Sequence, residues 1–183
     1  MQVAIIGAGP LGRWLGLAAA RAGYTVLLED VMPANLHHAQ EYLRQQLGPT
    51  ALPAVKFVST IEEAVREADL AIDCVPDELE SKLEIFCLLD RMSPPRTIFI
   101  TPTMKLSIAD LASCTYRADK CVALAMDVRQ LADEPLDKGE GQGGGRPILL
   151  RTPPPVTAET VALVRNFWTR VGFDPKFEAD LAQ

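Results

Sequence analysis

Histidine, paired cysteines and long apolar runs are all scarce in this sequence. The two histidines, His37 and His38, are adjacent on an expected helix and point to different sides. Exposed polar side chains are therefore a better interpretation of them than a metal site. The cysteines form no CxxC pair and no zinc-like spacing, so we expect no metal and only buried, reduced thiols at Cys74, Cys87, Cys114 and Cys121.

An excess of positive charge is also missing. The formal net charge is -6, which argues against nucleic acid or an anionic membrane surface as a partner. No apolar run approaches the length that spans a membrane. The first expected strand follows Met1 by one residue, which leaves no room for a targeting segment. We therefore expect a cytoplasmic protein.

What the sequence does have is enough apolar material for one domain. Its 183 residues are 48% hydrophobic, so we expect a single domain over residues 1–183. Residues 130–146, which are rich in glycine and charge, predict a mobile surface loop. A second phosphate-binding turn in GQGGGR is a weaker interpretation, because no strand enters it and no helix leaves it.

A glycine motif lies near the start of the chain. Residues 3–6 are an apolar run typical of a buried parallel strand, and Gly7, Gly9 and Gly12 follow as GxGxxG. In such a turn the first glycine permits the bend, the second admits a pyrophosphate and the third lets the helix pack on the strand. Pro10 suits the first helical position, and the helix N-terminus then faces the anion.

A second strand ends in two acids. After a helix to about Arg21, residues 25–28 predict a strand that leads into Glu29 and Asp30. A carboxylate there accepts hydrogen bonds from the adenosine ribose and repels the extra phosphate of NADP. We therefore predict NAD as the cofactor, with Asp30 ahead of Glu29 as the ribose ligand because it points past the sheet edge.

Strands and helices continue to alternate along the chain. The remaining expected strands cover residues 54–58, 70–75, 97–100, 120–126, 147–151 and 173–177. The remaining expected helices cover residues 35–47, 60–67, 77–91, 107–112 and 157–170, with Thr60 as a cap and Gly172 after the last one. This order predicts an α/β fold: a Rossmann-like, doubly wound, mostly parallel sheet with helices on both faces.

These residues carry a family resemblance. The glycine motif, residues 65–86, the run TIFITPTMKLSIADLA and the strand ending at residues 123–126 together resemble the N-terminal, NAD-binding domain of the 3-hydroxyacyl-CoA dehydrogenases. The most specific piece is DLAIDCVPDELESK. We expect NAD or NADH to be bound by Gly7, Ala8, Gly9, Pro10, Leu11, Gly12, Asp30, Val75, Asp77, Lys82 and Thr103.

The resemblance places two charged residues near the nicotinamide ribose. Asp77 and Lys82 match the acid and the lysine of the family pattern, and Val75 and Pro76 line the same edge. Asp77 is equally well placed to cap the helix expected over residues 77–91. Lys82 also fits a solvated helix lysine.

The catalytic part of the resemblance fails. The family has a serine after its fifth strand and a histidine that acts as general base after its sixth. Here those positions hold Met104 and Ala125, and Val128 stands where the family has asparagine. Neither Met104 nor Ala125 can accept a proton. No replacement for the family's orienting glutamate is evident in residues 147–151, and the family's second, helical domain has no counterpart here.

Three classes of function remain. We favour a binding module, in which NAD or NADH serves sensing, regulation or one subunit of a larger assembly. A dehydrogenase with unusual acid-base groups would draw on Thr101, Thr103, Asp127 and Lys105, of which Lys105 is the best candidate although it also fits a surface lysine. A scaffold that has lost its ligand is disfavoured by the intact glycine motif and Asp30. Apolar surface left uncovered by the helical domain predicts a homodimer or an unidentified partner subunit.

Overall fold

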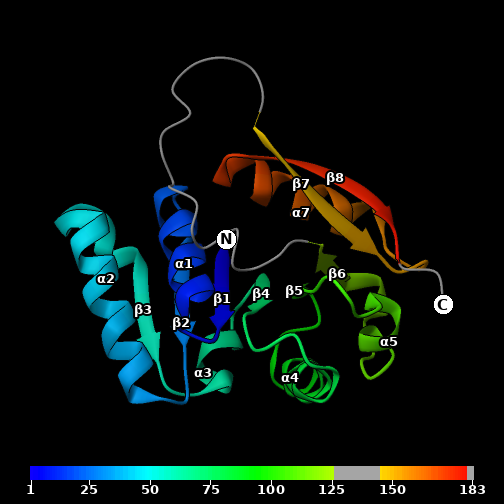
Figure 1. Cartoon of the computed structure of the whole chain (residues 1–183), viewed down its shortest axis with the longest axis horizontal. Helices are drawn as coiled ribbons and strands as arrows, with labels where there is room; N and C mark the ends of the chain where they lie inside the picture. The colour runs from blue at the N-terminus through cyan, green and yellow to red at the C-terminus, as the bar shows by residue number, and fades with distance from the viewer. Residues whose placement is uncertain (126–144, 181–183) are drawn as a thin grey trace.

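One eight-stranded sheet with helices on both faces organises the chain (Figure 1). This computed structural model describes residues 1–125 and 145–180, apart from the side chains of residues 49–51 and 53. The strand order is β3-β2-β1-β4-β5-β6-β7-β8, and β6 and β7 form the antiparallel pair in an otherwise parallel sheet. The predicted Rossmann-like fold is confirmed.

The elements alternate as the sequence predicts. The strands are β1 (Gln2–Ile6), β2 (Thr25–Glu29), β3 (Val55–Val58), β4 (Leu70–Asp73), β5 (Ile98–Pro102), β6 (Cys121–Leu124), β7 (Arg146–Thr152) and β8 (Phe173–Ala179). The helices are α1 (Pro10–Arg21), α2 (Pro33–Ala51), α3 (Ile61–Val65), α4 (Leu79–Met92), α5 (Ile108–Ala112) and α7 (Ala158–Val171), with 3-10 turns η1 (Leu52–Ala54) and η2 (Ala118–Lys120).

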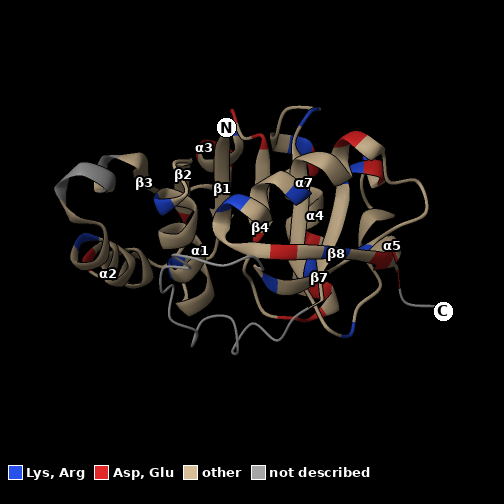
Figure 2. Cartoon of the chain, turned by 90° about the horizontal axis from the view of Figure 1, so that it is seen from above, with Lys and Arg blue, Asp and Glu red and all other residues tan. Residues whose placement is uncertain are grey.

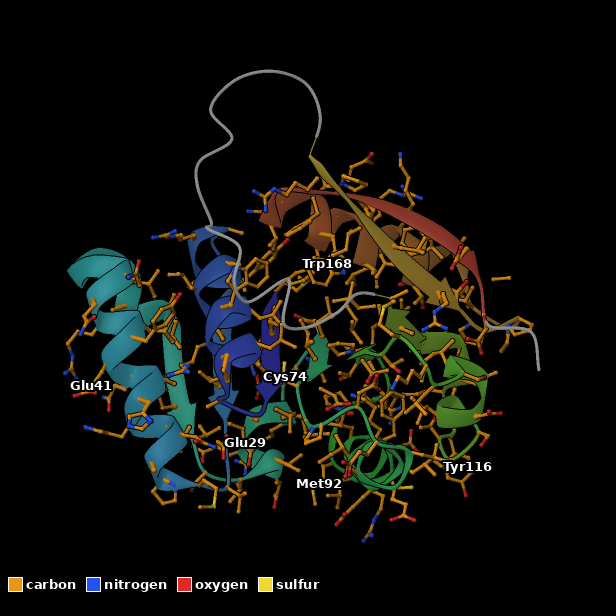
Figure 3. All side chains as sticks on the ribbon, viewed as in Figure 1. Glu29, Glu41, Cys74, Met92, Tyr116 and Trp168 are labelled. Atoms are coloured by element: carbon orange, nitrogen blue, oxygen red, sulfur yellow. The ribbon has the colours of Figure 1, made fainter. Side chains whose placement is uncertain are left out.

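The core has one cluster on each face of the sheet. Successive residues of a strand point to opposite faces, so Leu28 joins the cluster under α1, α2 and α7 while Leu27 joins the cluster under α3, α4 and α5. Trp168 of α7 anchors the first cluster and is fully buried (Figure 3). Phe86 of α4 anchors the second. Each such side chain stabilises the fold by roughly 1.5–3 kcal/mol through removal from water.

Several predicted helix ends are confirmed. The Thr60 hydroxyl accepts a hydrogen bond from the Glu63 N–H at 3.3 Å and so caps α3. Gly172 ends α7 in the left-handed conformation, with φ of 106°. Gly48, with φ of 67°, interrupts α2 where the sequence predicts its end.

Other predicted boundaries are wrong. The helix expected from residue 77 starts at Leu79 with Glu78 as its N-cap, so Asp77 does not cap it. The strand expected over residues 120–126 is shorter, because η2 occupies its first residue. Arg146 belongs to β7 rather than to the expected glycine-rich loop, of which residues 130–144 lie outside the described part of the chain.

The cysteines are free, as expected, but they are not all buried. Cys121 is buried, Cys74 and Cys114 are half-buried, and Cys87 is exposed. The expectation of four buried thiols is wrong at Cys87, which lies on the outer side of the amphipathic helix α4. Burial raises the pKa of the Cys121 thiol to about 12, so this sulfur stays protonated and unreactive.

Surface charge is mixed in sign on the side of the molecule that Figure 2 displays. Acidic and basic segments alternate along α7, β7 and β8 in that view. The ion pairs on exposed surface include Lys176 with Asp174 at 2.8 Å and Arg66 with Glu62 at 3.6 Å. Such exposed pairs contribute about 0–1 kcal/mol each, so they do not determine the fold.

Candidate functional site

The turn between β1 and α1 contains two glycines that the fold itself requires. Gly7 has φ of 103°, a left-handed conformation, and its N–H donates to the Glu29 carbonyl at 2.8 Å. A Cβ on Gly12 would lie 1.8 Å from the Gly7 carbonyl oxygen. The helix can therefore pack this closely on the turn only with a glycine at position 12.

Gly9 differs from its neighbours because the described protein does not need a glycine there. Its φ of -65° and ψ of -172° are an extended conformation, and a Cβ would meet nothing within 4 Å. Gly9 is the N-cap of α1, with Pro10 as the first helical residue and no side-chain cap. The N–H groups of the first turn thus have no side-chain cap, and such N–H groups suit an anion.

Asp30 joins the end of β2 to this turn. Its carboxylate accepts hydrogen bonds from the Ala8 N–H at 2.8 Å, the Met32 N–H at 2.8 Å and the Asn35 amide at 3.0 Å. The side chain is 7% exposed. A carboxylate has about four acceptor positions, so one remains for a further donor. Asp30 therefore lies against the glycine turn, where the sequence places it.

Glu29, the last residue of β2, is a buried carboxylic acid (Figure 3). Alternation along the strand puts it on the same sheet face as Leu27, away from the turn that Asp30 contacts. Its carboxyl group has no hydrogen-bond or ion-pair partner within residues 1–125 and 145–180. Burial, and then the negative charge of Asp30, raises the pKa of Glu29 to about 7.

A buried polar network lies at the carboxyl ends of β4 and β5. The Lys82 ammonium donates to the Asp73 carboxylate at 3.0 Å, to the Thr101 hydroxyl at 3.0 Å and to the Val75 carbonyl at 3.5 Å. The Thr101 hydroxyl donates to the same Asp73 oxygen at 2.8 Å. Lys82, Asp73 and Thr101 are each 0% exposed. Lys82 is thus not a solvated helix lysine, because these acceptors take all three of its donors.

Asp77 contacts the segment that follows β5. Its carboxylate accepts a hydrogen bond from the Met104 N–H at 3.3 Å. The Thr103 hydroxyl accepts the N–H groups of Lys105 at 3.3 Å and Leu106 at 3.0 Å, which shapes the same segment. The predicted residues Val75, Asp77, Lys82 and Thr103 therefore lie together at one edge of the sheet.

Arg151 of β7 is a buried cation at the same edge. It pairs in register with Ala123, which pairs with Thr101, so the three residues form one row across the sheet. Arg151 is 2% exposed, and its Nη2 donates to the Thr103 carbonyl at 2.6 Å. Its Nε and Nη1 atoms are buried and have no hydrogen-bond partner in the described part of the chain.

The structure describes two of the three positions where the resemblance implies the family's serine, histidine and asparagine. Met104 is 52% exposed just after β5. Ala125 follows β6 and donates its N–H to the Leu149 carbonyl at 2.9 Å. Both therefore flank Thr103, whose N–H donates to the Leu124 carbonyl at 3.0 Å. Val128, like Asp127, lies outside the described residues.

Sequence reasoning missed Asp73 and Arg151. Each is a charged residue inside an apolar strand, in the runs LAID and ILLR. A charge in a buried strand costs free energy unless it is paired, so these two positions were a signal that something must pair with them. Thr101 was considered only as a candidate acid-base group, whereas its hydroxyl is held between Lys82 and Asp73.

The remaining features considered in the sequence are the histidines, metal clusters and membrane spans within residues 1–125 and 145–180. His37 is exposed and lies 3.4 Å from Glu41, one turn further along α2. No cluster of three His, Cys, Asp or Glu residues that could hold a metal occurs in the described ranges. None of the helices within those ranges is both long and apolar enough to span a membrane.

Curated proteins of related sequence are dehydrogenases. The chain is 29% identical over 136 residues to a probable 3-hydroxybutyryl-CoA dehydrogenase of Bacillus subtilis, which covers 67% of this chain and 47% of that protein. It is 32% identical over 134 residues to a 5-formyl-3-hydroxy-2-methylpyridine 4-carboxylate 5-dehydrogenase of Mesorhizobium japonicum, with 67% and 43% covered. The chain thus spans about half the length of these relatives.

Solved structures and a family model agree with these similarities. The (S)-3-hydroxybutyryl-CoA dehydrogenase of Ralstonia eutropha superposes with a TM-score of 0.82 at 19% identity, covering 98% of this chain and 64% of that one. Residues 2–125 match the family model described as 3-hydroxyacyl-CoA dehydrogenase, NAD binding domain. The chain therefore belongs to the family of 3-hydroxyacyl-CoA dehydrogenase NAD-binding domains, and its cofactor is NAD.

Proposed function

We propose that this chain binds NAD or NADH for sensing, regulation or service as an accessory subunit, and that it does not run the standard dehydrogenase mechanism of its family. Met104 and Ala125 support the second half of the proposal. Both stand at the positions that the resemblance gives to the family's serine and histidine, and neither side chain can accept a proton. The alternative acid-base groups are poorly placed, because Lys105 is exposed and the Thr103 hydroxyl already binds two N–H groups.

The open space at Gly9 carries the proposal. Gly7 and Gly12 are explained by the backbone conformation and by helix packing, whereas nothing in the described protein approaches a Cβ at Gly9. A missing side chain there leaves room for a pyrophosphate against the uncapped N-terminus of α1. NAD therefore fits the residues present, and when bound it supplies a hydride acceptor or, as NADH, a donor.

The remaining cofactor contacts follow from the same arrangement. Asp30 has one acceptor position left for a ribose hydroxyl, and Asp77 lies at the edge proposed for the nicotinamide ribose. Lys82 is a positioning residue, because its three donors are taken by protein oxygens. The proposed set is Gly7, Ala8, Gly9, Pro10, Leu11, Gly12, Asp30, Val75, Asp77, Lys82 and Thr103.

A calorimetric titration of the purified chain with NAD, NADH and NADP tests this proposal. We expect NAD or NADH to bind and NADP to bind more weakly. Gly9→Val should abolish binding and leave the protein folded, since its Cβ meets open space. Gly16→Ala is the matched control: its Cβ would meet only ordinary contacts, the nearest 3.7 Å from Leu43, so affinity should be unchanged. Full affinity in folded Gly9→Val would exclude the glycine turn as the binding site.

The proposal also covers the oligomeric state of the chain. Leu79 is 46% exposed and Met104 is 52% exposed, and both lie close to Asp77, so apolar surface borders the proposed nicotinamide end. We infer that this chain is one domain in a cytoplasmic homodimer or in a complex with another subunit. Light scattering at micromolar concentration should give twice the monomer mass. A monomer that also retains full NAD affinity would count against the homodimer.

A further inference from the structure

Arg151 holds a buried positive charge that the described protein does not balance. Its side chain is 2% exposed, and its hydrogen-bond partner is a neutral carbonyl, that of Thr103. Glu178 lies opposite in register on β8 but is exposed and forms no ion pair with it. Lys82 of α4, buried against Thr101 of the same row, instead contacts the Asp73 carboxylate at 3.0 Å. A buried cation without such a partner is strongly disfavoured, so this arrangement favours an external anion.

The free donors of Arg151 match a carboxylate. A guanidinium has five N–H groups, of which the Thr103 carbonyl takes one from Nη2. Nε and Nη1 have no partner among the described residues. Nη2 has two hydrogens, one parallel to the Nε–H group and one parallel to an N–H group of Nη1. The Thr103 carbonyl takes one of them, so the other still forms a parallel pair with its neighbour on one edge of the guanidinium. A carboxylate accepts two such bonds side by side, and a single negative charge balances the arginine.

The register of the sheet places this guanidinium at the nicotinamide end of the site. The Arg151 backbone is level with Thr101, and its side chain reaches the Thr103 carbonyl, two residues nearer the carboxyl edge. Ala123 lies between them in the row and has a side chain of one carbon. Met104 follows β5, the strand of Thr101, and Ala125 follows β6, the strand of Ala123. These are the positions where the resemblance implies the family's serine and histidine. The unpaired Arg151 guanidinium, Met104 and Ala125 therefore all lie at the carboxyl edge of β5 and β6.

We propose that Arg151 binds the carboxylate of a small organic acid as a second ligand of this chain. The placement of that acid beside the nicotinamide rests on the proposed function, whereas carboxylate binding itself needs no NAD. The ligand class is a free acid with a single carboxylate rather than a neutral ester or amide. The acid displaces no protein group from Nε and Nη1, since none in the described ranges binds them.

Nuclear magnetic resonance of the Arg151 Nε–H group tests the proposal directly. The signal is assigned by its loss in Arg151→Lys, and the probes are propionate and its uncharged isostere propionamide. We expect propionate to shift the signal saturably and propionamide to leave it unchanged. Arg151→Lys keeps the charge but loses the planar edge, so propionate should bind at least about tenfold more weakly. Arg146→Gln removes a charge from the exposed start of the same strand and should change affinity less than about twofold.

The other outcomes overturn the proposal. Equal shifts with propionate and propionamide would show that charge plays no part, and a stronger effect of inorganic phosphate would identify a general anion site instead. Comparison of the two probes on the wild-type chain is decisive even where a variant fails to fold. A parallel titration with NADH separates the two proposals: propionate binding without NADH binding rejects the nucleotide function alone, and NADH binding without propionate binding rejects the Arg151 site alone.

Discussion

The two ends of the candidate site are built in different ways. At the adenosine end, the glycine turn and Asp30 lie within 24 residues of one another, and their contacts are mostly to backbone N–H groups. At the proposed nicotinamide end, Asp73 and Lys82 come from β4 and α4 and form an ion pair, and Arg151 of β7 lies at the same edge of the sheet. The first end depends on glycines and on one carboxylate that contacts backbone N–H groups, and the second depends on several buried charged side chains.

This contrast separates binding from specificity. A pocket built of backbone and open space binds a diphosphate with any sequence that supplies the glycines, so it can persist while other functions change. A pocket of buried charges is selective, because each charge requires a particular partner and a wrong partner leaves it unpaired. In our proposal, the nicotinamide end has Met104 and Ala125 in place of the family's serine and histidine. Lys82 is fully paired there, and the Nε and Nη1 atoms of Arg151 have no partner among the described residues.

Removal of Lys82 should give the largest effect. Lys82→Met leaves the Asp73 carboxylate buried without its cation, and we expect the free energy of unfolding to fall by about 3–5 kcal/mol. Urea denaturation measures this free energy of unfolding. Arg66→Met is the control, because Arg66 and Glu62 are 67% and 68% exposed and their pair contributes about 0.5 kcal/mol or less. The double variant Asp73→Leu/Lys82→Met should recover most of the loss, and failure to do so would show that the ion pair is needed beyond charge balance.

The packing of α1 on the glycine turn should give the next largest effect. Gly12→Ala puts a Cβ 1.8 Å from a backbone oxygen that cannot rotate away, so we expect destabilisation of about 3 kcal/mol and loss of NAD binding. Thermal unfolding and NADH titration measure the two effects. Gly16→Ala in the same helix should instead stabilise the protein by about 0.5–1 kcal/mol, since alanine is the better helix former and finds room there. Equal stability of the two variants would contradict the close packing.

Glu29 should make stability depend on pH near neutrality. Its pKa is raised from 4.5 to about 7 in the folded chain, so folding favours the protonated acid. Its stabilising contribution is complete below pH 4.5 and is lost as pH rises to about 7, which amounts to roughly 3 kcal/mol at most. Glu29→Gln should therefore match the wild type at pH 4.5 and exceed it in stability by up to about 3 kcal/mol at pH 7.5. A constant difference across that range would mean that Glu29 stays ionised.

Most of the fold was predictable because its signals are local. The apolar strand before Gly7, the Thr60 cap and Gly172 each depend on neighbours within a few residues, and all three are confirmed. The edge strand β8 also lies where a strand is expected, over residues 173–177, and extends to Ala179. The errors fall at boundaries, as at Asp77, where Glu78 rather than the preceding acid adopts the N-cap position.

The nicotinamide end was less predictable because its contacts span long separations in sequence. Lys82 and Thr101 meet across 19 residues, and Arg151 reaches the Thr103 carbonyl across 48. Helical spacing alone could not decide whether Lys82 faces solvent or the sheet, since that depends on how α4 lies over β4. Nor could the run ILLR show which way the arginine points until the antiparallel pairing with β6 set its register.

The smallest effect concerns the choice between NAD and NADP at the adenosine end. Asp30→Ala removes the carboxylate expected to repel a 2′-phosphate, so the ratio of NAD to NADP affinity should fall about tenfold, or about 1.4 kcal/mol. Calorimetric titration with both nucleotides measures that ratio. Because Asp30 also accepts the Ala8 N–H, some affinity for both should be lost, and only the ratio reports the charge. Glu29→Gln is the matched control, since Glu29 faces away from the turn. An unchanged ratio in Asp30→Ala together with a changed one in Glu29→Gln would move the ribose contact to Glu29.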